Sequence, residues 1–347
     1  MDGKRIKEIL SKFPQQRIVV FGDFFLDYYL IIDPVLDEIS IETNKTAYQI
    51  VERRPQPGAA GTVCNNLHAL GIGTITALTV IGDDGEGYAL KKALRQRGVD
   101  ISQIIQTEER FTPTYTKPMQ ITPDGEVEMN RQDTKNRSAL SSYIEDELCQ
   151  KLESLIPEHD AIIIADQVQE RNCGVITDRV RDALAELAKK YPDMIIFADS
   201  RERISEFRNV IIKPNRFEAV NAVRSGVEGE PETSLAQQCG NELREITGQP
   251  VFLTLDKEGV CPISDQDGQI VPCPPVDCPI DIVGAGDSTT AGILSSLATG
   301  ANLHEAAVIG NLVASITIRQ LGTTGTSSPD QVMEAWQSNQ EIYQDVS

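Results

Sequence analysis

The strongest constraint on the fold is the regular alternation of short apolar segments with longer amphipathic ones. From position 141 onward this pattern predicts helices at 142–155, 174–190, 215–224, 234–246, 286–299 and 303–320. It predicts strands at 161–165, 194–198, 210–212 and 251–255, with short strands near Val260 and Ile270. Strands that alternate with helices pair in parallel, because each helix carries the chain back along the sheet. We therefore expect an α/β protein built on one doubly wound sheet.

The first half of the chain interrupts this alternation twice with extra strands. It has predicted strands at 17–21, 28–32, 46–52, 74–81, 114–122 and 126–131, and predicted helices at 62–70 and 85–96. Pro123-Asp124-Gly125 is a good hairpin turn between the last two strands, and Gly98 should end the second helix. We expect the two insertions, about 28–57 and 111–131, to form a small β-sheet lid on a single domain that spans 1–347.

Near the carboxyl end, Asp281-Ile282-Val283-Gly284-Ala285-Gly286-Asp287 leads directly into a predicted helix. Its glycines let the backbone approach a ligand, and the start of a helix directs unpaired amide hydrogens toward one point. A phosphate group would bind there, beside an Asp287 carboxylate able to accept a proton from a hydroxyl. This interpretation predicts a phosphoryl-transfer centre. A plain turn followed by a helix-capping aspartate explains the same residues about equally well.

Two better-known nucleotide motifs do not occur in the sequence. It contains no G-x-x-x-x-G-K-[ST], and Thr289 occupies the third glycine position of a G-x-G-x-x-G pattern. The formal charge of −20 also excludes nucleic acid as a partner, because its phosphates would be repelled over most of the surface. An anionic substrate would need local positive charge, for which Lys117, Arg131 and Arg201 are the candidates.

Two groups of candidate substrate residues follow the first strand. Asp23 and Asp27 lie four residues apart, and paired carboxylates suit the hydroxyls of a polyol. A turn cap and a solvated acid are the alternative, which we favour for these two residues alone. The run from Gly58 to Gly61 removes side-chain bulk where a substrate can lie against the backbone, and a tight helix entry is equally consistent with it.

Two later turns are candidates for the phosphate and nucleotide ends of a site. Asn215 and Glu218 share the first turn of a helix and could hold hydrated Mg²⁺ near phosphates. The same pair also fits a capping box, and the spacing taken alone favours the capping box slightly over the Mg²⁺ role. The polar turn from Thr254 to Gly259 follows a strand and is a weak signal for a nucleotide edge.

The cysteine content and the length of the apolar runs indicate the compartment in which the protein works. Seven cysteines without a C-x-x-C pair predict free thiols and a reducing, cytoplasmic compartment. The first sixteen residues lack the apolar core of a signal peptide, and the longest apolar run, 306–318, is too short to span a bilayer. We therefore expect no membrane association. The three histidines, His68, His159 and His304, offer little material for catalysis or metal binding.

Taken in order, these motifs resemble the ribokinase-like sugar kinases of the PfkB family over essentially the full chain. The resemblance rests on these residues: Gly22-Asp23 with Asp27, Gly58-Ala59-Ala60, Ile81 to Gly87, Lys213-Pro214-Asn215 with Glu218, Thr254 with Gly259, and Asp281 to Asp287. It implies a three-layer α/β/α sandwich with a small β-sheet lid. It also implies ATP and Mg²⁺ as cofactors, and a homodimer that forms through the lid.

The resemblance assigns roles to individual residues. Asp287 would be the catalytic base, with Gly284, Ala285 and Gly286 as the anion hole. The sugar would contact Asp27 and Gly58, with Asp23, Ala59, Thr62, Lys117 and Arg131 completing its site. Asn215 and Glu218 would order Mg²⁺ through water, while Thr254, Asp256, Gly259 and Asn311 line the nucleotide pocket. Carbonyls around Asp281 and Val283 offer a site for a monovalent cation such as K⁺.

Within the family the layout is most similar to the heptose phosphate kinases. Leu26-Asp27-Tyr28, Asp37 to Ser40, Tyr115-Thr116-Lys117 and Leu321-Gly322-Thr323 carry that similarity. The chain departs from the branch where Thr62 replaces a usual Asn, Met119 replaces a basic residue, 166–169 lack a lysine and a glycine, and Asp256 replaces a glycine. Since the sequence ends at Ser347, we expect no attached nucleotidyltransferase domain.

The sequence thus predicts an ATP-dependent kinase that phosphorylates a sugar or a sugar phosphate, with a heptose phosphate as one option. A non-catalytic sugar or nucleotide sensor on the same fold is the alternative, because Thr62 and Asp256 are unusual. A Rossmann-type oxidoreductase is a third class, which lacks its glycine fingerprint here.

Overall fold

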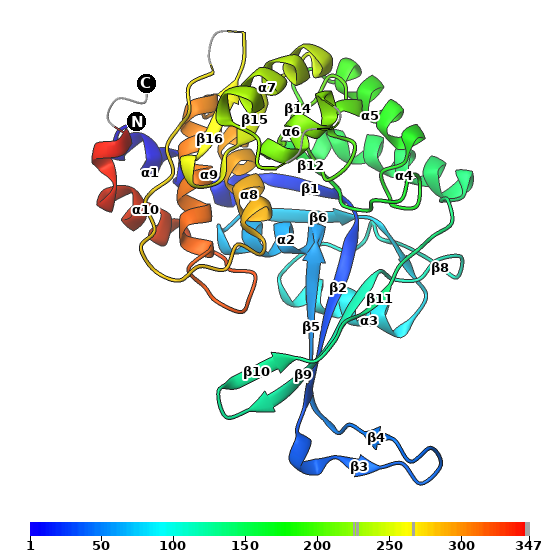
Figure 1. The fold of residues 1–347 in the computed structure, drawn as a ribbon. Coiled ribbons are helices and arrows are strands. Elements are labelled where there is room, and N and C mark those ends of the chain that lie inside the picture. Colours follow the sequence, from blue (N-terminus) through cyan, green and yellow to red (C-terminus); the bar gives the residue numbers. More distant parts are fainter. Residues whose placement is uncertain (225, 227–228, 266–267, 344–347) are drawn as a thin grey trace.

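The computed structural model describes residues 1–224, 226, 229–265 and 268–343. A seven-stranded sheet in the order β16-β15-β14-β13-β12-β1-β6 forms its centre (Figure 1). Its strands are β1 (Arg17–Gly22), β6 (Thr74–Leu78), β12 (Ala161–Asp166), β13 (Ile195–Ser200), β14 (Ile211–Ile212), β15 (Val251–Thr254) and β16 (Val260–Ile263). All neighbours pair in parallel except β16, which runs antiparallel to β15.

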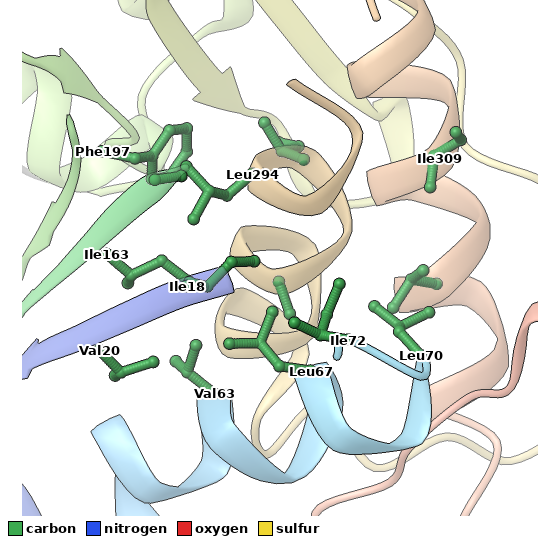
Figure 2. Packing of buried hydrophobic residues seen from close by; sticks show 14 of the residues in the cluster. Ile18, Val20, Val63, Leu67, Leu70, Ile72, Ile163, Phe197, Leu294 and Ile309 are labelled. Carbon is green, nitrogen blue, oxygen red and sulfur yellow. The ribbon is translucent and has the colours of Figure 1, made fainter. Parts of the chain in front are cut away.

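Helices cover both faces of this sheet. They are α1 (Gly3–Ser11), α2 (Ala60–Ala69), α3 (Gly85–Gln96), α4 (Ser142–Leu155), α5 (Asp178–Lys190), α6 (Arg216–Val223), α7 (Thr233–Thr247), α8 (Ala285–Ala298), α9 (Leu303–Thr317) and α10 (Pro329–Ser338). The side chains of β1 alternate between the two layers. Ile18 and Val20 face the layer that holds α2, α8 and α9 (Figure 2), whereas Val19 and Phe21 face the layer that holds α4 and α5. A strand buried on both faces is the pattern of a parallel sheet between two helical layers.

A second, smaller sheet extends from the body (Figure 1). Its order is β10-β9-β2-β5, with β11 also paired to β9. Its strands are β2 (Phe24–Ile32), β5 (Ile50–Ala59), β9 (Thr114–Thr122), β10 (Gly125–Glu128) and β11 (Gln132–Thr134), and two further pairs are β3 (Glu38–Ile39) with β4 (Thr46–Ala47) and β7 (Val80–Gly82) with β8 (Ile105–Thr107). Only Asp23 separates β1 from β2, so the chain passes almost directly from the central sheet into this small sheet.

The predicted α/β sandwich with helices on both faces is confirmed, and several element boundaries are corrected. The strand expected at 28–32 begins at Phe24, because β2 pairs with β5 from Phe24 onward and with β9 from Leu26 onward. The helix expected from 174 begins at Asp178, where the Thr177 side chain accepts the amide of Val180. No strand forms at Ile270, where Val260 and Val271 make only an isolated bridge.

Two general properties of the chain complete this description. Within its described part, none of the helices is both long and apolar enough to cross a membrane. All seven cysteines lie in the described part of the chain, and none of them forms a disulfide.

Candidate active site

A cavity of about 1160 Å³ lies at the carboxyl ends of the central strands, between the body and the small sheet. Open α/β sheets place their ligands at this edge, because the loops after successive strands meet there. Its walls include side chains that follow β13, β14 and β15, the start of α8, and the face of the small sheet. Most of the predicted site residues line it: Asp27, Ala59, Thr62, Lys117, Arg131, Asn215, Glu218, Thr254, Asp256, Gly259, Gly284, Ala285, Gly286, Asp287 and Asn311.

The start of α8 forms one part of the wall. Gly284 precedes the helix with φ +81°, a left-handed conformation that favours glycine. Ala285 donates its amide to the carbonyl of Ile282 at 3.1 Å, which leaves it less available to a ligand than predicted. Among the described residues, no backbone acceptor pairs with the amides of Gly286 or Asp287. These two amides, rather than that of Ala285, can therefore donate to an anion.

Asp287 does not cap the helix, since α8 has no side-chain cap. It belongs to a cluster of four charges in which the Lys213 ammonium lies 2.9 Å from the Asp199 carboxylate. Burial, with the charge of Asp199, raises the pKa of Asp287 to about 7 against the opposing effect of Lys213. Burial and Asp199 likewise raise the pKa of Glu218 to about 7. Burial disfavours the charge of Lys213, but the surrounding carboxylates outweigh it and raise the Lys213 pKa.

Asn215 and Glu218 form the predicted capping box of α6. The Asn215 side chain accepts the Glu218 amide at 2.8 Å, and Glu218 Oε2 accepts the Asn215 amide at 2.7 Å. Among the described residues, no group of three or more His, Cys, Asp or Glu side chains could hold a metal ion. Glu218 lines the cavity, and a single carboxylate there fits Mg²⁺, which keeps most of its waters and takes few protein ligands.

The turn after β15 forms the far end of the cavity. Asp256 occupies a left-handed conformation with φ +53°, and its carboxylate pairs with the Arg216 guanidinium at 3.0 Å. Aspartate is among the few residues other than glycine that adopt this conformation readily. At Gly259, an added Cβ would lie 2.1 Å from the carbonyl oxygen of Val271, so only glycine fits. Asn311 donates to the Val271 carbonyl at 2.8 Å and holds the adjacent loop.

At the small sheet, Asp27 pairs with Lys117 at 2.8 Å. Gly58 lies behind this pair rather than in the cavity wall, since a Cβ there would lie 2.4 Å from Asp27 Oδ2. Thr62 lies beside the start of α8, where its methyl group would contact a Cβ placed on Gly284 at 3.4 Å. The cavity wall therefore brings together residues from α2, the small sheet and α8.

Two further predicted residues are not in the wall. Asp23 is buried, and its carboxylate accepts the backbone amides of Gln167, Val168 and Val175 at 2.7–3.1 Å, so both of its oxygens already have hydrogen-bond donors. Asp281 accepts the amides of Val283 at 3.0 Å and Gly322 at 3.1 Å, which shapes the loop before α8. A monovalent cation at that loop stays a prediction.

Sequence reasoning missed the central carboxylate of the site. Asp199 lies near the carboxyl end of strand β13, and that position was the available signal. Lys213 was noted only as part of a motif, because nothing in the sequence shows that its ammonium is buried among acids.

The comparison with known families is decisive. The model described as the pfkB family of carbohydrate kinases matches residues 16–331. The chain belongs to the pfkB family. It is therefore a sugar kinase, a phosphotransferase that acts on a sugar hydroxyl.

Similar curated proteins of this family are longer than the chain. The bifunctional protein HldE of Trichlorobacter lovleyi is 30% identical over 337 residues, which cover 96% of the chain and 66% of the relative. HldE of Geotalea uraniireducens is 27% identical over 335 residues, covering 96% and 65%. The chain thus spans about two thirds of the length of these pfkB-family relatives.

Solved structures show the same fold at low sequence identity. Phosphofructokinase-2 from Escherichia coli, solved with potassium, has a TM-score of 0.69 and 19% identity. The comparison covers 93% of this pfkB-family chain and 99% of the phosphofructokinase chain. Ribokinase from Arabidopsis thaliana, solved with ribose and ATP, has a TM-score of 0.64 and 14% identity, with 92% and 98% covered. The pfkB-family chain therefore has the ribokinase-like sandwich that its motifs predicted.

Proposed function

We propose that this kinase transfers the γ-phosphoryl group of ATP to a hydroxyl of a phosphorylated sugar, with Asp287 as the base. The observation that carries the proposal is the start of α8, where the partly buried carboxylate of Asp287 lies beside two available amides and the Lys213 cluster. The cavity extends from there to the small sheet in one direction and to the 254–259 turn in the other. It can thus hold an acceptor and a nucleotide with their reacting groups at Asp287.

The residues divide the chemistry between them. The acceptor hydroxyl gives its proton to Asp287 as its oxygen attacks the phosphorus atom, and the bond to the ADP oxygen breaks. The amides of Gly286 and Asp287, with the Lys213 ammonium, stabilise negative charge on the migrating group. An added Cβ on Gly286 would lie 3.8 Å from Lys213 Nζ, so the ammonium and the amides are close enough to contact the same phosphoryl group. Glu218, with Asn215, would hold hydrated Mg²⁺, which supplies neutralisation of the phosphate charge.

The raised pKa values predict a pH dependence. A base must be deprotonated, and the pKa of Asp287 near 7 means that protons remove its reactive form as the pH falls through neutrality. We expect kcat/KM to rise with pH between about 5 and 8 with an apparent pKa near 7, to which Glu218 contributes because it titrates in the same range. Steady-state assays across this range measure it, and a flat profile would contradict a carboxylate base with raised pKa.

A cluster of cations at the small-sheet end supports a phosphorylated acceptor. Lys135 lies over the Tyr115 ring at 5.9 Å, and Arg131 lies over it at 4.7 Å while pairing with Asp133. Arg201 lines the same cavity, and its charge opposes the rise in the pKa of both Tyr115 and Asp287. Among the described residues, neither Lys135 nor Arg201 has a carboxylate partner within ion-pair distance. Cations without partners in so acidic a chain suit an anionic group on the acceptor.

Replacing both of these cations tests the acceptor class. We expect Arg201→Gln with Lys135→Gln to raise the KM for a sugar phosphate by roughly tenfold or more, since charge-assisted hydrogen bonds are lost. The KM for ATP should stay close to normal, and Lys92→Gln, at an exposed position on α3, is the matched control. An equal loss for phosphorylated and unphosphorylated sugars would contradict the assignment.

Release of ADP with a panel of sugars and sugar phosphates tests the function itself. The proposal requires ADP formation that depends on one acceptor and on Mg²⁺. Binding of nucleotide and sugar without ADP release would instead support the sensor. Heptose phosphates belong in the panel because HldE relatives share this domain.

We also propose that two copies associate through the small sheet. Apolar side chains are exposed on and beside the arm that carries β3 and β4, among them Val35, Leu36, Ile39, Ile41 and Tyr48. Exposed apolar groups gathered on one projection favour a protein partner. Light scattering should give twice the chain mass, and a monomer at assay concentration would exclude this association.

A further inference from the structure

The segment between β12 and α5, residues 167–175, forms one wall of the cavity. Gln167, Val168, Gln169, Glu170 and Cys173 line the cavity from it. The segment contains no helix or strand, so its amides and carbonyls need partners from elsewhere in the chain. We call it the wall loop.

Asp23 supplies partners for the amides of the wall loop. One carboxylate oxygen accepts Gln167 N at 2.8 Å and Val168 N at 3.1 Å, and the other accepts Val175 N at 2.7 Å. The two ends of the loop are therefore tied to one side chain, which is only 3% exposed. Gly174 packs directly on it, since a Cβ there would lie 2.8 Å from Asp23 Oδ1.

Arg203 supplies partners for the carbonyls of the same loop. Its guanidinium donates to Gln169 O at 2.8 Å and to Val168 O, and it lies 3.4 Å from the buried carboxylate of Asp166. Arg203 is itself buried. A buried anion thus accepts from one side of the loop and a buried cation donates to the other.

This arrangement is costly to the folded protein. Burial, with the nearby charge of Asp166, raises the pKa of Asp23 to about 6 even though three amides hydrogen-bond to its carboxylate. A buried charge is destabilising unless it is well paired, so a hydrophobic anchor would hold an ordinary loop at lower cost. The charged side chains add directionality, because each one hydrogen-bonds to particular backbone groups of the wall loop.

We propose that Asp23 and Arg203 are positioning residues that fix the wall loop in the shape that selects the acceptor sugar. Asp23 is not among the residues that line the cavity, and it acts through the amides that it holds. The inference rests on the proposed function in one respect, namely that the acceptor binds between the wall loop and the small sheet.

Asp23→Asn tests this in the full chain. It preserves side-chain size but places an NH₂ group against at least one backbone amide, so hydrogen bonds to the loop are lost. We expect the acceptor KM to rise by roughly tenfold, while the KM for ATP changes by less than about twofold. Hydrogen exchange should speed up at the amides of Gln167, Val168 and Val175 and stay unchanged in α8. Asp160→Asn is the matched control, because Asp160 accepts the Arg17 amide at 2.8 Å at the opposite edge of the sheet.

Gly174→Ala gives a second perturbation that keeps the carboxylate. Its methyl group would press on Asp23 Oδ1 and on Val168 Cβ, so the same rise in acceptor KM is expected if Asp23→Asn folds poorly. The proposal would be overturned if both KM values rose and kcat fell by the same factor. Faster hydrogen exchange in the wall loop with an unchanged acceptor KM would overturn it as well. Absence of turnover in the unmodified chain would instead reject the proposed function, since the exchange measurement needs no substrate.

Discussion

Asp287→Asn is expected to lower kcat by roughly 10²–10⁴, the usual contribution of a positioned general base. The amide preserves the size of the side chain but cannot accept the proton of the acceptor hydroxyl. ATP affinity should remain close to that of the unmodified protein, because the amides at the start of α8 and the Lys213 ammonium are retained. Single-turnover kinetics and calorimetric titration with ATP measure the two quantities separately.

Asp330→Asn is the matched control for this prediction. Asp330 also lies in the first turn of a helix, α10, and it is not among the residues that line the cavity. A general effect of first-turn aspartates on folding would appear in both variants. Near-normal turnover in Asp287→Asn would reject Asp287 as the base, whereas loss of ATP binding would show that its main role is to shape the helix start.

Lys213→Met is expected to lower the unfolding free energy by roughly 3–5 kcal/mol, the typical result of removing one partner of a buried ion pair. It leaves the carboxylates of Asp199, Glu218 and Asp287 close together without their cation, and Asp199 loses a contact of 2.9 Å. Urea unfolding measures the change. Activity should fall as well, since the ammonium no longer stabilises the migrating phosphoryl group.

The double variant Lys213→Met with Asp199→Asn separates charge from packing. Removing the Asp199 charge relieves the repulsion, so part of the lost stability should return while activity stays low. If the single variant is as stable as the unmodified protein, the four charges do not form the interdependent cluster that the distances describe.

The order of strands and helices was readable from the sequence because apolar periodicity reflects burial on each face. The pattern at β1, where Ile18 and Val20 face one layer and Val19 and Phe21 the other, gave an uninterrupted apolar run that only a doubly covered strand explains. The residues at which helices and strands begin and end were harder to predict. Phe24 belongs to a strand because it pairs with Ala59 of β5, which lies far along the chain.

The site was predictable where a residue acts through its local backbone, as at Gly284 and at the capping box of Asn215 and Glu218. It was not predictable where the role depends on burial by distant elements. Asp23 has the residue type and position of a sugar ligand, yet the loop after β12 takes both of its oxygens. Asp199 belongs to the site because Lys213, which directly follows the next strand, pairs with it, and the sequence alone does not show this contact.

The passage from β1 to β2 through a single residue has a mechanical meaning. A sheet attached by a long linker could swing freely, but here the turning point is Asp23, which is bonded to the loop opposite. Movement of the small sheet away from the body therefore strains the same carboxylate that shapes the acceptor wall. The small sheet and the acceptor wall are thus mechanically coupled, and neither is expected to shift without the other.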